Sequence, residues 1–211
     1  MIIASPYIDS LLGVLLICLA TSVATLPLGA HLTGYQGLGR ALTLTAALGV
    51  SLLTFIASIL YYIFPPTVAA FMSFSITLMI GGLTWWRSID RVIRLPYNLP
   101  QLALGMGVTV LILFGFIANR LSVLFPDEPI HLSLSATIAA GNYPVKLPWA
   151  PDSPAAYHYA ADLHVSLLTA ITQLPVGITA EFQHAWLSLG LIFAVFGIAR
   201  HATHSTPASL F

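Results

Sequence analysis

Residues 10–30 read SLLGVLLICLATSVATLPLGA and contain no charged side chain. An α-helix rises about 1.5 Å per residue, so a run of this length reaches across the ~30 Å hydrocarbon layer of a bilayer. The stretch is also too long, and lacks the preceding positive residues, for a cleaved secretory signal. It therefore predicts a membrane-spanning helix at the start of the chain.

The composition of the whole chain agrees with this stretch. Of 211 residues, 58% are hydrophobic and 7% are charged, and the mean hydropathy is +0.92. Soluble domains carry roughly 25% charged residues, which excludes a water-exposed globule. The net charge of zero and the absence of a basic run give no support to nucleic-acid binding. The single Cys18 leaves no intrachain disulfide and no cysteine-based metal site.

Four further stretches have the length and polarity of spanning helices. They cover about residues 41–64, 67–86, 100–119 and 182–199. Pro65-Pro66 breaks the second of the five helices, and Trp85-Trp86 ends the third in the headgroup region. The fold class predicted is an all-α, polytopic integral membrane protein. It has about five transmembrane helices and two amphipathic juxtamembrane helices in a large external loop.

The basic residues predict the orientation of these helices. If the chain alternates across the membrane, five of the seven fall on one side: Arg40, Arg87, Arg91, Arg94 and Arg200. Excess Lys and Arg marks the cytoplasmic side. We therefore expect a multi-pass protein of the cell membrane with an extracytoplasmic N-terminus. Its three regions are a four-helix membrane region (1–119), an extracytoplasmic loop (120–181), and a fifth span with a short tail (182–211).

The predicted external loop gathers most of the ionisable side chains. It includes FPDEPIHLSLSATIAAGNYPVKLPWAPDSPAAYHYAADL, residues 125–163. Five of the seven acids and four of the seven histidines lie between residues 127 and 184: Asp127, Glu128, Asp152, Asp162, Glu181, His131, His158, His164 and His184. This end of the molecule is the natural place to look for chemistry.

Helix punctuation in the loop predicts a first short helix over about 128–140. Asp127 suits the N-cap, Pro129 the first turn, and Gly141 the position past the end. Steps of four place Asp127, His131 and Ser135 on one stripe, with Glu128 beside them. Ile130, Leu134 and Ile138 form an adjacent apolar stripe, which suits a helix lying along the membrane surface.

A second short helix is predicted to begin near Pro154 and to end before Pro175. One face is expected to be polar, with His158, Asp162, Ser166, Thr169 and Gln173. A short spanning or re-entrant helix is the alternative description of this segment.

Each of these features also has a purely structural explanation. Asp127 suits a plain helix cap, and His158 and Asp162 are spaced to stabilise their own helix. Tyr157 and Tyr159 suit ordinary interface aromatics. The histidines lack a zinc spacing such as H-E-x-x-H, so the metal requirement stays open, with Glu128 and His131 as possible ligands of a divalent ion.

In combination, the order of these elements resembles a known family. An outward helix leads to an acidic pair, then to "GNYP", a proline-tryptophan connector and "YHY". This resembles the first external loop of the GT-C superfamily of polyprenol-dependent membrane glycosyltransferases. Within that superfamily it resembles the protein O-mannosyltransferases and the prokaryotic "YYY" membrane proteins. The resemblance covers about residues 110–200.

The resemblance implies a sugar transferase that uses a polyprenyl-phosphate donor and an acceptor hydroxyl. Asp127 matches the family's key acid, as general base, and Glu128 matches the second acid of its pair. The substrate-binding residues expected with them are Arg120, His131, Lys146, Tyr157, His158, Tyr159 and Asp162. Membrane lipid and a membrane partner subunit are the other partners expected.

The chain departs from the family pattern in two ways. Family members usually place the acidic loop after their first membrane helix, whereas here three further predicted helices come before the helix that leads into the loop. Family members are also commonly longer, with further spans that build the donor site. We therefore expect residues 1–211 to correspond to the N-terminal portion of such an enzyme, or to one subunit of it. The alternative is a non-catalytic membrane subunit or scaffold whose external loop docks a partner.

Overall fold

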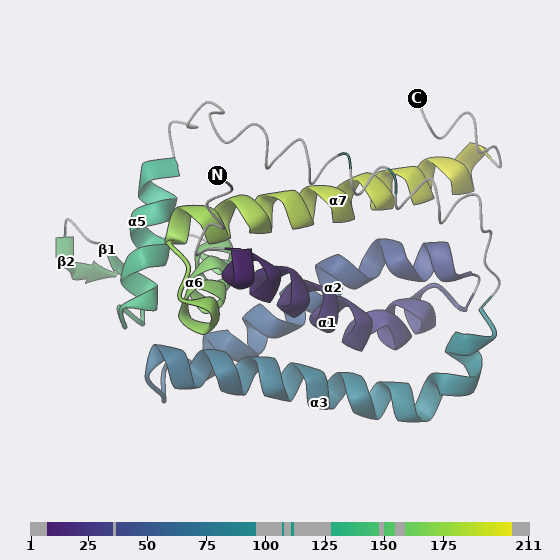
Figure 1. Ribbon diagram of the computed structural model, residues 1–211, viewed down its shortest axis with the longest axis horizontal. Helices are drawn as coiled ribbons and strands as arrows, with labels where there is room; N and C mark the ends of the chain where they lie inside the picture. Colours follow the sequence, from purple (N-terminus) through teal and green to yellow (C-terminus); the bar gives the residue numbers. More distant parts are fainter. Residues whose placement is uncertain are drawn as a thin grey trace, which may run out of the picture.

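The computed structural model describes residues 8–35, 37–95, 107, 111, 128–147, 150–154 and 159–203 (Figure 1). The described residues are helical apart from one small hairpin and the connections. The helices are α1 (Ile8–Leu32), α2 (Leu38–Leu60), α3 (Pro66–Ile93), α5 (Glu128–Ala139), α6 (Ala160–Thr172) and α7 (Val176–Thr203). Strands β1 (Lys146–Leu147) and β2 (Ala150–Pro154) pair antiparallel.

Two of these helices are long and apolar enough to cross a membrane: Leu12–Leu32 within α1, and the whole of α3. The pair α6 and α7 passes the same test jointly, with a bend of 120° between the two helices, and would make a third span. The apolar part of α2, Leu44–Leu60, is shorter than a full crossing. The described part of the chain is therefore helical, with two or three potential membrane spans.

These helices give fewer than the five predicted spans, but they do not test all five, because part of the chain is not described. The predicted fourth helix, 100–119, lies outside the described residues except for Gly107 and Leu111, which are both helical. The predicted fifth helix, 182–199, lies within α7. The five-span count therefore stays a prediction.

Two predicted boundaries were wrong. The third helix continues past Trp86 to Ile93, because Ile89, Val92 and Ile93 extend its apolar pattern and no proline intervenes before Pro96. The second loop helix begins at Ala160 and not near Pro154, because residues 150–154 form strand β2. The first loop helix, predicted over 128–140, is α5.

Small side chains allow α1 to pack closely against both α2 and α3. A Cβ atom on Gly49 of α2 would lie 3.1 Å from the backbone of Thr21, and one on Gly81 of α3 would lie 2.8 Å from the Cα of Ala24. Thr25 of α1 also donates a hydrogen bond of 3.0 Å to the carbonyl of Thr45 on α2. Membrane helices associate in this way, through small residues and interhelical hydrogen bonds.

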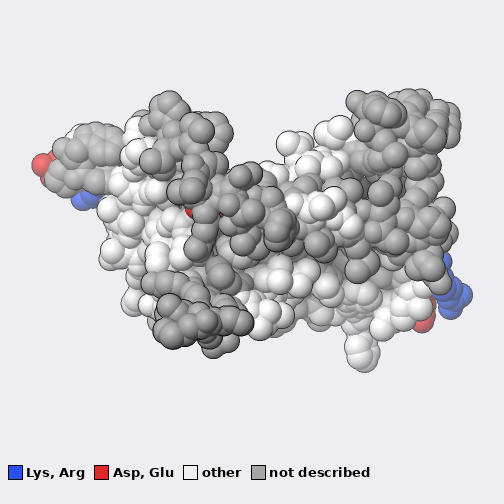
Figure 2. All heavy atoms as spheres, turned by 45° about the horizontal axis from the view of Figure 1, so that its top comes forward, with Lys and Arg blue, Asp and Glu red and all other residues white. Residues whose placement is uncertain are grey.

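The two ends of the bundle differ in chemistry. The α1–α2 connection and the C-terminal ends of α3 and α7 lie at one end, whereas α5, α6 and the hairpin lie at the other (Figure 1). The first end carries the backbone positions of the five arginines predicted to share one side: Arg40, Arg87, Arg91, Arg94 and Arg200. Figure 2 shows Lys or Arg atoms together with Asp or Glu atoms at both extremities of the visible face. Which end faces the cytoplasm stays a prediction.

Candidate functional site

An ion pair between side chains joins the two short helices α5 and α6. The Nδ1 atom of His131 lies 3.0 Å and 3.2 Å from the two carboxylate oxygens of Asp162. The hydroxyl of Ser135 donates to the Oδ1 atom of Asp162 at 3.2 Å. His131 and Ser135 are one helical turn apart on α5, on the polar stripe predicted from the sequence. We call His131, Ser135 and Asp162 the α5–α6 polar cluster.

The carboxylate of Asp162 is buried, although an isolated buried charge is strongly unfavourable. Its residue is 2% exposed, whereas the side chain of His131 is 36% exposed. Asp162 lies in the first turn of α6, where the peptide dipoles favour a negative charge. The helix terminus, the imidazole and the hydroxyl together replace the water that the carboxylate has lost.

This contact assigns different roles to the two ring nitrogens of His131. An ionised carboxylate only accepts hydrogen bonds, so Nδ1 carries the proton that faces Asp162. Any proton that His131 exchanges with another group therefore passes through Nε2. A histidine held by a carboxylate in this way can orient a hydroxyl or transfer a proton at the end of the bundle.

Much of the polar stripe predicted on α6 is covered. Asp162 and Ser166 are both buried, and the Oγ1 atom of Thr169 is 2.8 Å from that of Thr179 on α7. These side chains bond to α5, to α7 and within α6 itself, whereas Gln173 at the end of the stripe is exposed. Periodicity located the polar stripe but could not show what covers it.

A cluster of four tyrosines lies at the same end of the bundle. The ring of Tyr143 makes edge-to-face contacts with Tyr61, Tyr62 and Tyr159, at centroid distances of 5.7, 4.7 and 6.1 Å. The Tyr143 hydroxyl donates to the carbonyl of Ser58 at 3.0 Å. Burial raises the pKa of Tyr61 to about 12 and moves the pKa of Tyr143 well above its usual value, so both phenols stay protonated at neutral pH.

Sequence analysis missed Tyr61 and Tyr62 as members of this end of the molecule. The pair stands in YYIFPP, between the second and third helices. That connection was treated only as a helix break. The alternation that placed residues 120–181 outside also places this connection on the same side, so the signal was present.

The structure accounts for some of the predicted site residues and not for others. Asp127, Arg120, Tyr157 and His158 lie outside the described residues, and Glu128 is placed only as the first residue of α5. His131 and Asp162 are brought together as described above.

The two remaining predicted residues lie on other elements. Tyr159 immediately precedes α6 and belongs to the tyrosine cluster. Lys146 is exposed in β1, and its backbone is bonded to the side chain of Asn142.

The described residues contain no group of three or more His, Cys, Asp or Glu side chains that could hold a metal ion. The Nδ1 atom of His131 is also committed to Asp162. No coordination geometry can therefore be assigned to the divalent ion considered from the sequence.

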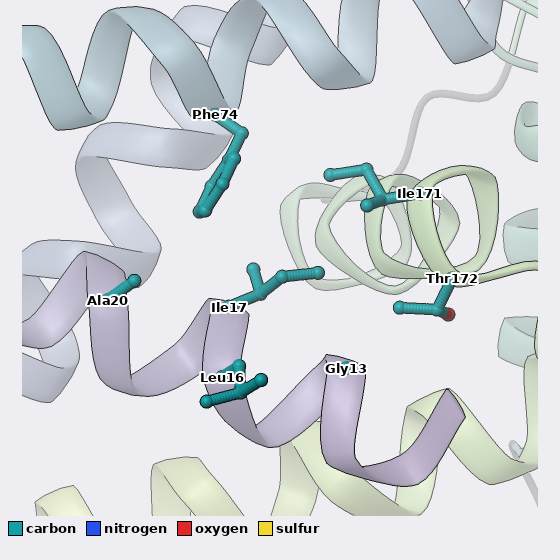
Figure 3. A pocket seen from close by; sticks show the side chains of 7 residues that line it. All are labelled: Gly13, Leu16, Ile17, Ala20, Phe74, Ile171 and Thr172. Atoms are coloured by element: carbon teal, nitrogen blue, oxygen red, sulfur yellow. The ribbon is translucent and has the colours of Figure 1, made fainter. Parts of the chain in front are cut away.

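An apolar groove of about 590 Å³ lies beside the other end of α6 (Figure 3). Its walls come from three helices, with Ile17 on α1, Phe74 on α3 and Ile171 on α6. The full lining is Gly13, Leu16, Ile17, Ala20, Phe74, Ile171 and Thr172. The lining is mostly hydrocarbon, which suits an apolar chain more than a polar ligand.

The fold and composition define a helical membrane protein with a polar cluster at one end of its helices. Comparisons with protein-family models, with curated proteins and with solved structures find no match to this chain. The GT-C resemblance therefore stays a prediction from the residues quoted above.

Replacing Asp162 with alanine is expected to loosen α5 from α6. The change removes the acceptor of Ser135 and of His131 and leaves a buried hydroxyl without its partner, at a cost of about 1–3 kcal/mol. Hydrogen exchange of α5 in detergent micelles, together with thermal unfolding, would measure the effect. Asp152→Asn is the matched control, because Asp152 is exposed on β2. Unchanged protection of α5 in Asp162→Ala would contradict the assigned role.

Proposed function

We propose that this chain is all or part of a membrane glycosyltransferase that moves a sugar from a polyprenyl-phosphate donor to an acceptor hydroxyl. The supporting observation is the α5–α6 polar cluster, because it fixes the helix that directly follows Asp127. Helix periodicity places Asp127 one turn before His131 on the same stripe. The acid that the resemblance selects is thus expected one helical turn before the polar contact at this end of the bundle.

The proposed reaction is a single displacement at the anomeric carbon. The acceptor oxygen forms a bond to that carbon as the bond from the carbon to the phosphate oxygen breaks. The phosphate leaves as an anion with the bonding electrons, and the Asp127 carboxylate accepts the hydroxyl proton. One displacement inverts the anomeric configuration. Phosphate leaves readily as an anion, so protonation of the leaving group by a general acid is not essential.

The other predicted residues would bind the reactants. Glu128 and His131 would orient the acceptor, with His131 held in place by Asp162. Tyr157, His158 and Tyr159 would line the same pocket. Arg120 and Lys146 would contact the donor phosphate through charge-assisted hydrogen bonds. The apolar groove between α1, α3 and α6 offers carbon-lined surface for a lipid tail (Figure 3).

One observation favours a second function, that of a non-catalytic membrane subunit. The Asp162 carboxylate is buried and already bonded by His131 and Ser135, as expected of a purely structural link between two helices. The exposed hairpin with Lys146 and Asp152 would then dock a partner protein. Mass spectrometry of the gently purified chain separates the two functions. A copurifying polyprenyl-phosphate lipid supports the transferase, and a stoichiometric partner protein supports the subunit.

A transfer assay tests the proposed enzyme directly. The purified chain in liposomes would receive a polyprenyl phosphate carrying a radiolabelled sugar, together with membrane extract as the source of acceptor. Label is expected to move to the acceptor. An inverted product and label transfer that requires the chain would support the proposal. No transfer across a panel of hexose donors, with the helical fold intact, would contradict it.

The proposed orientation can be tested by cysteine labelling. In a Cys18→Ala background, a membrane-impermeant maleimide is expected to label Asp152→Cys on intact cells, and Asp90→Cys only after permeabilisation. Both positions are exposed, one on the hairpin and one near the C-terminal end of α3, so accessibility alone does not separate them. The reverse pattern would place the polar cluster in the cytoplasm and contradict the proposed orientation.

A further inference from the structure

The C-terminal turns of α3 carry two adjacent stripes of exposed side chains. Arg87, Arg91 and Arg94 are all exposed and follow one another at steps of four and three. Trp86, Ile89 and Ile93 form the second stripe, at steps of three and four. They are 86%, 45% and 71% exposed. A cationic stripe beside an apolar stripe is the pattern of a helix segment at the level of lipid headgroups.

Beside these stripes lies an open hollow of about 550 Å³, lined by Tyr35, Asp90, Arg91, Arg94 and Leu95. The guanidinium of Arg91 lies over the ring of Tyr35, 5.7 Å from its centroid, which restrains the arginine at the rim. Leu95 is buried. The hollow is therefore a defined polar depression attached to a longer apolar surface.

The three arginines at the C-terminal end of α3 form no ion pair with a described carboxylate. Among the residues that the structure describes, no carboxylate lies within ion-pair distance of Arg87, Arg91 or Arg94, although Asp90 is on the same helix turns. Three arginines against one aspartate leave an excess of positive charge. Guanidinium groups match the oxygen geometry of phosphate and bind it through paired hydrogen bonds.

The apolar stripe identifies the source of the phosphate. The exposed apolar side chains of α3 continue along the helix through Val68, Phe71, Met79 and Leu83, so lipid tails would cover this surface up to Ile93. A free phosphate ion would use the arginines alone. A lipid would use both stripes, with its phosphate against the arginines and its upper tail against Trp86, Ile89 and Ile93.

We propose that the C-terminal end of α3, together with Tyr35, binds the phosphate headgroup of an anionic phospholipid. This site lies at the end of the bundle opposite the α5–α6 polar cluster (Figures 1 and 2). It is independent of the proposed sugar transfer. Its lipid would fix the depth of α3 in the bilayer.

Native mass spectrometry of the full chain tests this site. The protein would be released from micelles holding equal amounts of phosphatidylglycerol and phosphatidylcholine, and the bound lipids would be counted. A severalfold excess of phosphatidylglycerol is expected on the unaltered chain. Arg91→Gln with Arg94→Gln is expected to bring the ratio of the two bound lipids close to one, since each basic residue near an anionic surface contributes roughly a fivefold attraction. Ser153→Asp is the control, because it lowers the net charge at an exposed position on β2, at the opposite end.

Two further experiments distinguish a lipid phosphate from a free phosphate ion. Trp86→Ala with Ile93→Ala is expected to weaken phosphatidylglycerol binding while all three arginines remain. Inorganic phosphate at millimolar concentration is expected to leave the bound lipid in place. Circular dichroism and size-exclusion chromatography would confirm that each variant keeps its helices.

Three results would overturn the site. The first is equal binding of the two lipids to the unaltered chain. The second is an equal loss of preference in Ser153→Asp, which would indicate attraction by charge in general. The third is displacement of the lipid by inorganic phosphate, which would indicate a free-anion site.

Discussion

Replacing Asp127 with asparagine is expected to lower sugar transfer by roughly 10²–10⁴-fold, the usual contribution of a positioned general base. Asparagine keeps the size of aspartate and can still cap α5, but its amide does not accept the proton of the attacking hydroxyl. The loss should appear in kcat, because the proton moves only as the new bond forms. The liposome transfer assay described above would measure it.

The control must separate catalysis from folding and from the loss of a negative charge. Asp152→Asn removes an exposed carboxylate at the same end of the bundle and should keep full activity. Membrane insertion and thermal unfolding of Asp127→Asn should match those of the unaltered chain. Full transfer activity in Asp127→Asn would exclude it as the base, and equal losses in both variants would indicate a general charge effect.

The second large effect is expected at Gly81, where α3 approaches α1. A Cβ atom on Gly81 would overlap the Cβ of Ala24 and would lie 2.8 Å from its Cα and 2.9 Å from its carbonyl oxygen. Backbone atoms cannot rotate away from such an overlap, so Gly81→Ala must separate the two helices. We expect the free energy of unfolding to fall by about 3 kcal/mol, which is the upper end of the usual cost of overpacking.

Gly82→Ala is a matched control in the same helix. A Cβ atom on Gly82 would meet nothing within 4 Å, so this variant changes helix propensity alone and should be neutral or slightly stabilising. Unfolding by SDS in mixed micelles, followed through tryptophan fluorescence, would compare the two. Equal stability of the two variants would show that α1 and α3 do not pack as described.

Part of this fold could be predicted because lipid imposes strict demands on a sequence. The uncharged run of residues 10–30 can adopt few structures in lipid other than a long helix, and α1 spans Ile8–Leu32. The end of α3 was misplaced because a tryptophan pair marks the depth of a helix in the bilayer and does not end its hydrogen-bond ladder. The hairpin was missed because β1 has two residues, which is too few to show an alternating pattern.

The candidate site shows the same limit. Periodicity correctly placed His131 and Ser135 on one stripe of α5, because both belong to the same helix. The partner of that stripe, Asp162, lies 31 residues beyond His131 in the sequence, and only the packing of α5 against α6 brings them together. Local patterns describe a surface, whereas the group that covers it depends on the tertiary fold.

The position of Tyr143 has a consequence for how a ligand would meet this end of the molecule. One ring touches tyrosines from the α2–α3 connection and from the start of α6, and its hydroxyl is bonded to α2. The segment after α5 therefore loses its conformational entropy during folding and not at the moment of an encounter. A ligand that arrives here meets a preorganised surface, and less of its binding energy is consumed in ordering the protein.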